Sequence, residues 1–348
     1  MKVVIIHLDG LGYDYLKKSD LSYIKSLGGY LHRIPVYPGY FSNEVSLFTG
    51  LTPKQHKMED LFIFDPASSP FKNNISLLIP KKLFRLASYF YGYKTYINIS
   101  PPKKYFKKFV PISKIQPRDF NNSFSSLLIK NGFKFRYINS LHFSASNIKK
   151  AIQKNDCVYA INSTYDKLLH KYGTEKIIKT NIDNIIKDIH EFLLKKYNNN
   201  FYLFLLSDHG MVPVHTKIKL ELNDKNNLFF VDSTILRVWS NKYYSLNSTG
   251  TELYDSKEFQ NGPFKYYKKF LAAPGYIFSP NFFQGYKDIK GMHGYKSTNS
   301  PHDAFVLIHT PRYKKQHNAN SSIIDIAPTI LKIFNMKSPT EMGGRSLL

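Results

Sequence analysis

FYLFLLSDHGM at residues 201–211 places six apolar residues directly before a serine, an aspartate and a histidine. A short apolar run of this length is typical of a buried strand. In open α/β sheets, ligands bind beyond the carboxyl ends of the strands. The stretch therefore predicts a strand of an α/β sheet that delivers Asp208 and His209 to a binding crevice.

Two other apolar runs lead to metal-ligand residue types in the same way. VVIIHL directly precedes Asp9, and CVYAIN comes shortly before Asp166 and His170. Asp166 and His170 are four residues apart, so both side chains lie on one face of a helical turn. His293 follows later in the chain. We expect these side chains to meet at one edge of the sheet.

Three aspartates and three histidines thus form one ordered series: Asp9, Asp166, His170, Asp208, His209 and His293. Carboxylate oxygens together with imidazole nitrogens suit two mixed sites for zinc, with manganese or iron as alternatives. Taken singly, an aspartate after a strand is about as often a helix N-cap. The joint pattern is harder to obtain by chance, and it favours a metal centre.

The rest of the pattern is that of one α/β unit, because open α/β folds of 348 residues commonly form a single domain spanning 1–348. The predicted strands are 3–8, 201–207 and 303–309, and the predicted helices are 13–27, 43–49, 174–197 and 322–335. The helix at 174–197 separates His170 from the next strand, as a crossover between parallel strands requires.

Two stretches fit the core poorly. Residues 100–150 are rich in Pro, Lys, Phe and Asn, and we expect a variable insertion there. Residues 212–291 contain several short strand-like runs between His209 and His293, and we expect a small cap subdomain. Within it, Asp232-Ser233-Thr234 and Arg237 are interpreted either as phosphate contacts or as an exposed turn and strand.

Six motifs give the chain a resemblance to the alkaline phosphatase superfamily, and within it to the type I phosphodiesterase and nucleotide pyrophosphatase branch. They are LDGLG, SLFTGLTPKQH, DKLLHKYG, SDHGM, MHGY and DIAPTIL, and they span nearly the whole chain. SDHGM and the separated HG are the specific ones. The resemblance implies an α/β fold with a central, mostly parallel sheet, helices on both faces and a small cap insertion that helps select the substrate.

The resemblance also implies a ligand assignment and a mechanism. One divalent metal ion would be held by Asp166, His170 and His293, and the other by Asp9, Asp208, His209 and the nucleophile. Zinc is the expected ion and manganese the alternative. The reaction implied is two-metal phosphoryl transfer to a nucleophile. The chain is therefore interpreted as a phosphodiesterase or nucleotide pyrophosphatase that acts on a phosphate-ester small molecule or glycan.

The nucleophile is where the sequence departs from the family pattern. Counting back from Thr49-Gly50 without gaps puts Tyr40 at the position where the family has Ser or Thr. Ser42 lies two residues later and is the better nucleophile chemically, since a helix N-terminus favours the alkoxide. Ser42 is also interpreted as an N-cap of the 43–49 helix. A third reading is that neither attacks, so that a metal-bound hydroxide does the work or the site has lost activity.

The irregular nucleophile keeps other functions open. One is a catalytically silent, metal-bound protein that recognises a phosphorylated glycan or lipid head group, and another is a phosphomonoesterase. A sulfatase would need a C/S-x-P-x-R segment, which the chain lacks.

Charge and cysteine content limit the partners and the cellular location that the sequence predicts. The net charge of +24 would attract anionic substrates or surfaces, although a lysine-rich composition alone gives the same value. No nucleic-acid-binding motif is present. The single cysteine, Cys157, rules out an internal disulfide, and no apolar run has the length of a signal sequence or a membrane span. A cytoplasmic location is the default expectation, and the oligomeric state is left open.

Overall fold

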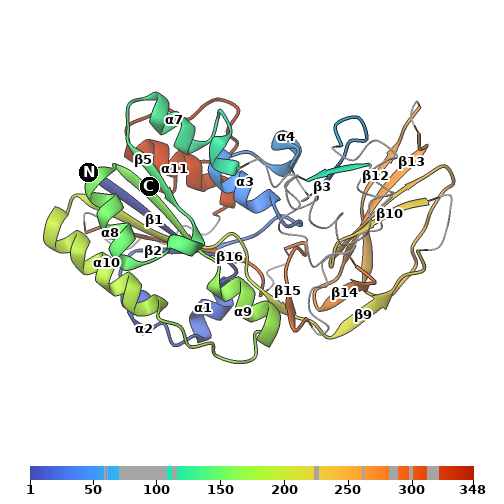
Figure 1. Cartoon of the computed structure of the whole chain (residues 1–348), viewed down its shortest axis with the longest axis horizontal. Coiled ribbons are helices and arrows are strands. Elements are labelled where there is room, and N and C mark those ends of the chain that lie inside the picture. The colour runs from blue at the N-terminus through green and yellow to red at the C-terminus, as the bar shows by residue number, and fades with distance from the viewer. Residues whose placement is uncertain are drawn as a thin grey trace, which may run out of the picture.

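The computed structural model describes residues 1–58, 60, 62–69, 108–111, 116–222, 227–260, 263–281, 289–297, 301–311 and 321–348. Its main body is a six-stranded sheet in the order β2-β16-β7-β1-β6-β5 (Figure 1). The strands are β1 (Lys2–Leu8), β2 (Tyr30–Ile34), β5 (Phe135–Ile138), β6 (Cys157–Asn162), β7 (Phe201–Leu206) and β16 (Ala304–His309). Four neighbours, β7, β1, β6 and β5, run parallel, and β16 is antiparallel to both β2 and β7. The predicted mostly parallel α/β sheet is confirmed.

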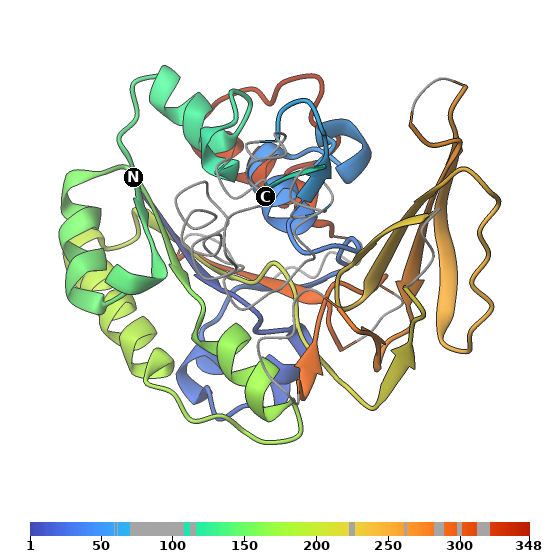
Figure 2. The ribbon, with the colours of Figure 1, turned by 45° about the vertical axis from the view of Figure 1, so that its right-hand side comes forward.

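Helices cover both faces of this sheet (Figures 1 and 2). One face carries α1 (Tyr13–Lys18), α2 (Ser22–Ser26), α8 (Ala145–Lys154), α9 (Thr164–Tyr172) and α10 (Ile182–Tyr197). The other carries α3 (Ser42–Thr49), α7 (Phe124–Lys130) and α11 (Ile326–Ile333). Successive β1 residues enter opposite cores, Val4 and Ile6 one of them and Val3 and Ile5 the other. A strand buried on both faces is continuously apolar, which explains the run before Asp9.

Two predicted helices begin or break at places that the apolar spacing does not mark. The predicted helix 13–27 is two helices, because α1 ends at Lys18 and the backbone of the next residue, Ser19, is extended with ψ 168°. The predicted helix 174–197 starts only at Ile182. Ile178 is buried in a non-helical segment, where its amide donates to the Tyr15 hydroxyl at 2.8 Å. Its apolar side chain continues the helical spacing by coincidence.

The predicted helix 322–335 is shorter and begins with a 3-10 turn, η6 (Ile323–Asp325), before α11. Ser322 and Asp325 cap this turn reciprocally, side chain to backbone. Two further 3-10 turns are η4 (Pro117–Asp119) and η5 (Ser140–His142). None of the helices in the described residues is long and apolar enough to cross a membrane.

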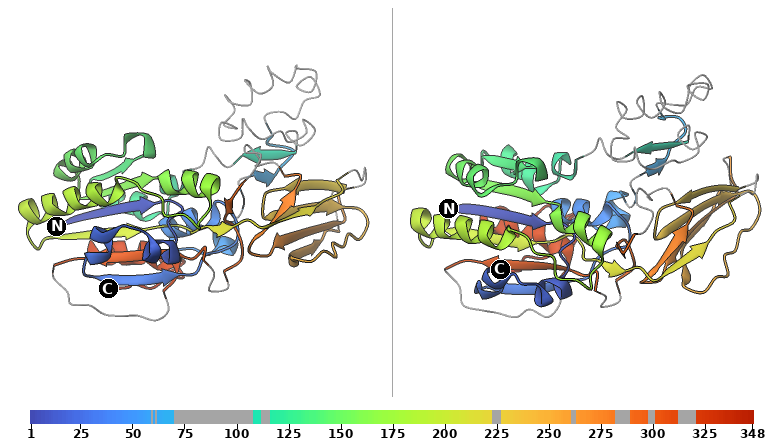
Figure 3. Two further views of the ribbon diagram at one scale, coloured as in Figure 1. Left: turned by 90° about the horizontal axis from the view of Figure 1, so that it is seen from below. Right: turned by 60° about the horizontal axis from the view of Figure 1, so that its bottom comes forward.

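A second, smaller sheet lies beside the main body, in the order β10-β11-β13-β12 (Figures 2 and 3). Its strands are β10 (Asn227–Val231), β11 (Ile235–Ser240), β12 (Thr251–Glu258) and β13 (Tyr266–Ala272). All neighbours are antiparallel. This sheet, here called the cap sheet, falls within the 212–291 segment for which we expected a cap subdomain.

Short pairs of strands join the cap sheet to the main body. They are β14 (Tyr276–Ser279) with β9 (Thr216–Lys219), β15 (Gly291–Met292) with β8 (Val212–Pro213), and β3 (Phe62–Phe64) with β4 (Phe109–Pro111). Helix α4 (Pro53–His56) precedes β3. The stretch 100–150, expected to be an insertion, is described only in part, and it contributes β5 to the edge of the main sheet.

Candidate metal centre

The candidate ligands meet where parallel strands of the main sheet end. Asp9 follows β1 directly, and Asp208 and His209 lie two and three residues beyond the end of the neighbouring strand β7. On the other side of β1, strand β6 leads into α9, which carries Asp166 and His170. The predicted helical turn is confirmed. The amide of Asp166 donates to the carbonyl of Asp9 at 3.0 Å, which ties the two loops together.

Glycines permit this close approach. Gly10 has a φ of 77°, and a Cβ on it would lie 2.7 Å from the Cα of Asp166. A Cβ on Gly12 would lie 2.6 Å from the Cα of Gly210. Contacts this short exclude any side chain, so both positions require glycine. The glycines of LDGLG and SDHGM are there because the ligand-bearing loops touch.

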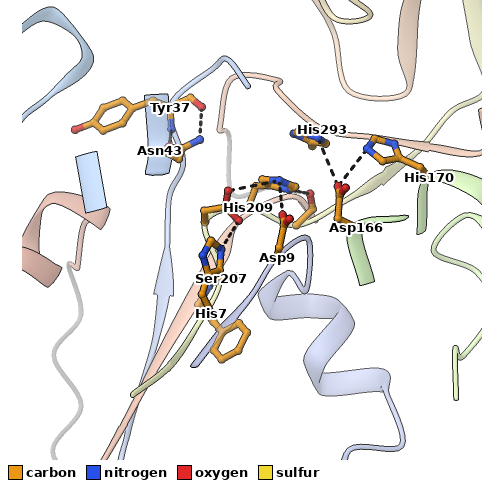
Figure 4. A network of polar contacts seen from close by, with 12 residues as sticks. His7, Asp9, Tyr37, Asn43, Asp166, His170, Ser207, His209 and His293 are labelled. Atoms are coloured by element: carbon orange, nitrogen blue, oxygen red, sulfur yellow. Dashed lines mark hydrogen bonds and ion pairs between the residues drawn. The ribbon is translucent and has the colours of Figure 1, made fainter. Parts of the chain in front are cut away.

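Asp166 lies between two histidines (Figure 4). Its Oδ1 is 3.2 Å from Nε2 of His170 and 3.7 Å from Nε2 of His293, which follows β15. This is the group predicted for the first metal ion. The three ligand atoms lie within 4.8 Å of one another.

His209 lies among the other two carboxylates (Figure 4). Its Nε2 is 3.4 Å from Oδ1 of Asp9 and 3.6 Å from Oδ2 of Asp208. The His209 ring also stacks on that of His293 with centroids 3.7 Å apart, so the two halves of the cluster are continuous. Two further groups of three residues have ligand atoms within 4.8 Å of one another. One group is Asp9, Asp166 and His209, and the other is His7, Asp9 and Asp208.

The tautomers of two histidines fit metal coordination. Nδ1 of His170 faces the carbonyl of Gly291 at 2.8 Å, and Nδ1 of His209 faces that of Gly210 at 3.0 Å. A carbonyl only accepts, so each Nδ1 carries the proton and Nε2 of a neutral ring presents a lone pair toward the cluster. Ligating histidines are oriented in this way in metalloproteins. Oδ1 of Asp166 is buried with no hydrogen-bond partner among the described residues, as expected of an atom reserved for a cation.

The charges of the cluster perturb one another. Burial would lower the pKa of His209, but the carboxylates of Asp208 and Asp9 raise it to about 10. Burial and the carboxylates of Asp166 and Asp208 raise the pKa of Asp9. Burial and the imidazoles of His209 and His170 hold the pKa of His293 well below its usual value. Such a concentration of carboxylate and imidazole groups suits divalent cations, whose charge offsets the repulsion between the carboxylates.

Two residues that the sequence analysis missed stand behind Asp208. Nε2 of His7 donates to Oδ1 of Asp208 at 2.9 Å, and the hydroxyl of Tyr159 lies 2.7 Å from Nδ1 of His7. His7 and Tyr159 are buried on the neighbouring strands β1 and β6. The available signal was a histidine inside the apolar run of β1, two residues before Asp9 and hence on the same face of the strand.

The two candidate nucleophiles lie in different surroundings. Ser42 is the first residue of α3 and is fully buried, and its hydroxyl faces the carbonyl of Pro38 at 3.2 Å. The interpretation of Ser42 as an N-cap is wrong, because Phe41 occupies the cap position and no side chain caps the helix.

Tyr40 makes contacts with the cap instead. Its hydroxyl lies 2.8 Å from the hydroxyl of Thr234 and accepts from the Thr234 amide at 2.9 Å. Burial holds its pKa well above the usual value, and its ring packs edge-on against His293 with centroids 5.2 Å apart. In this arrangement the phenol stays neutral and is bonded to the cap.

The segment 232–234 is not an exposed turn. Asp232, Ser233 and Thr234 are fully buried, and Thr234 also donates to the carbonyl of His293 at 3.2 Å. Nη1 of Arg237 lies 3.3 Å from Asp60, and its Nη2 lies 3.7 Å from Asp232. The expectation of an exposed turn and strand is wrong because the cap sheet turns this segment toward the main body.

Comparison with known proteins shows the family of the chain and the similarity of its fold. Residues 3–261 match the family model described as type I phosphodiesterase/nucleotide pyrophosphatase. The fold is similar to that of murine ectonucleotide pyrophosphatase/phosphodiesterase 5, with 15% identity, a TM-score of 0.69, and coverage of 97% of this chain and 96% of that one. The human protein of the same name gives 14% identity, a TM-score of 0.70, and coverage of 99% and 97%. An inactive variant of the murine protein is in complex with AMP. No curated protein sequence matches.

Proposed function

The chain belongs to the type I phosphodiesterase/nucleotide pyrophosphatase family and is a phosphodiesterase-type hydrolase, and from this premise we propose that it cleaves a phosphodiester or pyrophosphate bond at the cluster of six ligands with two divalent metal ions. One observation carries the proposal. Three aspartates and three histidines from four separate segments of the chain bring their side chains together at one sheet edge, and Nδ1 of His170 and of His209 is bonded to a backbone carbonyl so that Nε2 faces the cluster.

Asp166, His170 and His293 would hold one ion, and Asp9, Asp208 and His209 the other. The oxygen and nitrogen donors suit zinc, with manganese as the alternative. When bound, such ions supply Lewis acidity toward phosphoryl oxygens and lower the pKa of a coordinated oxygen nucleophile. The protein's own contribution is to hold the ligands rigidly, through the glycine contacts at Gly10 and Gly12 and the carbonyl bonds of the histidines.

Ser42 is proposed as the nucleophile. It begins α3, where the N–H groups of the first turn have no partner within the helix and favour a negative charge. Its hydroxyl would leave the Pro38 carbonyl and release its proton to solvent while the serine oxygen bonds to phosphorus. The bond from phosphorus to the leaving oxygen breaks in the same step, and the leaving oxygen takes up a proton from solvent. Water would then cleave the phosphoseryl ester and restore the hydroxyl. The phenol of Tyr40 is bonded to Thr234, which argues for a role in holding the cap rather than in attack.

A nucleotide-like substrate is the first to test. The net charge of +24 draws anionic molecules to the surface. AMP is the molecule bound by the inactive variant of the similar murine protein.

A second candidate is a metal-bound protein that binds a phosphorylated ligand without turnover. The observation that favours it is that Tyr40, which stands at the position where the family has its nucleophile, has its hydroxyl bonded to the cap.

Hydrolysis of bis-p-nitrophenyl phosphate beside p-nitrophenyl phosphate, on protein loaded with zinc or manganese, tests the proposal. Faster cleavage of the diester is expected. Faster cleavage of the monoester would assign a phosphomonoesterase instead. No cleavage of either ester or of a nucleotide diester, with about two metal ions bound per chain, would favour the silent binding protein.

A further inference from the structure

A large cavity, here called the cap cavity, lies outside the metal cluster. It is open to solvent and is lined by the cap sheet together with α4 and β3, and its volume is about 980 Å³. None of the six candidate ligands lines it. Cavities of this size hold ligands of nucleotide size or somewhat larger.

One wall of the cap cavity is aromatic. Trp239 of β11 stacks on Phe64 of β3 with centroids 5.1 Å apart, and Tyr267 of β13 lies 5.0 Å from Trp239. Phe62, Tyr254, Phe259 and Phe264 also line the cavity. Aromatic walls of this kind stack on planar ring systems, and the stacking tolerates different bases.

The rim of the cap cavity is cationic. Lys54 and Lys57 project from α4 and the residue that follows it, and both are exposed. Among the described residues, the two acids that line the cavity already face cations. Asp60 lies 3.3 Å from Arg237 and 3.4 Å from Lys269, and Asp255 lies 3.2 Å from Lys257.

Buried charges at and behind the cavity wall add to this positive character. Arg237 and Lys269 are buried cations that share Asp60. Asp232 lies beside these charges, with its carboxylate 3.7 Å from Arg237. Burial raises the pKa of Asp232 to about 7, so this carboxyl is only partly ionised at neutral pH. An anionic group entering the cavity would therefore meet an excess of positive charge.

We propose that the cap cavity is a second binding site for a nucleoside phosphate, with the base against the exposed rings of Tyr254 and Phe259, beside buried Trp239, and the phosphate at Lys54 and Lys57. A ligand with an aromatic base fits better than a plain sugar phosphate, because the lining offers ring faces. The two carboxylates that line the described part of the cavity are engaged by cations. The site is separate from the metal centre, so it goes beyond the phosphodiesterase function and does not depend on it.

The protein contains its own reporter for this site, because Trp239 is the one tryptophan among the 348 residues. Metal-free protein is titrated with AMP, and tryptophan fluorescence is excited at about 295 nm, where adenine does not absorb. The expected result is a saturable change in fluorescence. Ribose 5-phosphate and adenosine, which lack the base or the phosphate, should each bind at least tenfold more weakly.

Three variants locate the binding. The double change Lys54→Ala and Lys57→Ala should weaken AMP binding at least fivefold, because both lysines face the proposed phosphate position. The matched double change Lys195→Ala and Lys196→Ala removes two exposed lysines at the end of α10 and should leave binding unchanged. Asp208→Ala, which alters the metal centre, should also leave it unchanged.

Three results would overturn the proposal. Fluorescence that does not respond to AMP means that the cavity binds no nucleotide. Equal binding of ribose 5-phosphate means that the aromatic wall does not stack on a base. Binding that disappears in Asp208→Ala places the nucleotide at the metal centre alone. Turnover of the diester in the metal-loaded enzyme is measured separately, so failure here leaves the proposed hydrolase function standing.

Discussion

Tyr159→Phe tests whether the buried pair behind Asp208 positions that carboxylate. The change removes only the hydroxyl that lies 2.7 Å from Nδ1 of His7, while the ring keeps its packing on Phe48 and Tyr137. In the neutral imidazole, Nε2 donates to Asp208, so Nδ1 accepts from Tyr159. Without the hydroxyl, Nδ1 is left buried with no donor.

The expected magnitude follows from this geometry. A buried group left without its hydrogen bond costs about 1–3 kcal/mol of the free energy of unfolding. Loss of a group that orients a ligating side chain typically lowers metal affinity by about 10- to 100-fold, which is roughly 1.4–2.8 kcal/mol of binding free energy. Both effects should appear in one variant, because His7 contacts Asp208 directly at 2.9 Å.

Two assays separate these effects. Urea unfolding of the metal-free protein gives the change in stability, and a competition titration with a zinc chelator gives the affinity for the metal ion. Tyr137→Phe is the matched control, since its ring stacks on Tyr159 at 5.6 Å but its hydroxyl does not face His7. Zinc affinity within twofold of the wild type in Tyr159→Phe, despite a loss of stability, would refute the positioning role and leave a purely structural hydrogen bond.

Three further predictions concern other parts of the chain. Asp60→Ala leaves Arg237 and Lys269 buried without their shared carboxylate, and it should lower the free energy of unfolding in urea by about 3–5 kcal/mol. The control Asp119→Ala removes the more exposed ion pair with Arg118 and should cost less than about 1 kcal/mol. Similar costs for the two variants would contradict the buried charge cluster. Ser42→Ala should abolish formation of a phosphoenzyme and lower turnover of the diester by about 1,000-fold or more, whereas Tyr40→Phe should retain most activity. The reverse order of the two variants would assign the attack to Tyr40. Burial and neighbouring His309 lower the pKa of His190 to about 4, so between about pH 6.5 and 4 the unfolded chain binds more protons, and the stability present above pH 6.5 is lost as the pH falls through that window. The melting temperature of His190→Gln should therefore fall less over this range than that of the wild type. Parallel melting curves for the two proteins would show that other groups set the acid sensitivity.

The sequence alone predicts the sheet and most of the cluster because most ligands are coupled to a local signal, whereas His293 is placed by the resemblance of MHGY to the family motif. Asp9 follows an apolar strand directly, Asp208 follows one after a single serine, and the spacing of Asp166 and His170 is helical, so the edge on which they meet follows from the rule for open α/β sheets. The structure brings all six together without exception.

What the sequence does not predict depends on contacts between distant segments. Tyr159 and His7 are 152 residues apart, and Tyr40 and Thr234 are 194 apart. Neither tyrosine differs locally from the other tyrosines of the chain. The split at Ser19 is hidden as well, because the backbone becomes extended there while the apolar spacing continues.

The most direct test of the central claim is the rate of bis-p-nitrophenyl phosphate hydrolysis by metal-loaded wild type and Asp208→Ala, with His215→Ala as an exposed histidine outside the cluster. The metal-centre assignment predicts that Asp208→Ala loses turnover by about 1,000-fold or more while its unfolding transition is retained, and that His215→Ala matches the wild type. Wild-type turnover in metal-saturated Asp208→Ala would contradict the assignment of the reaction to this cluster.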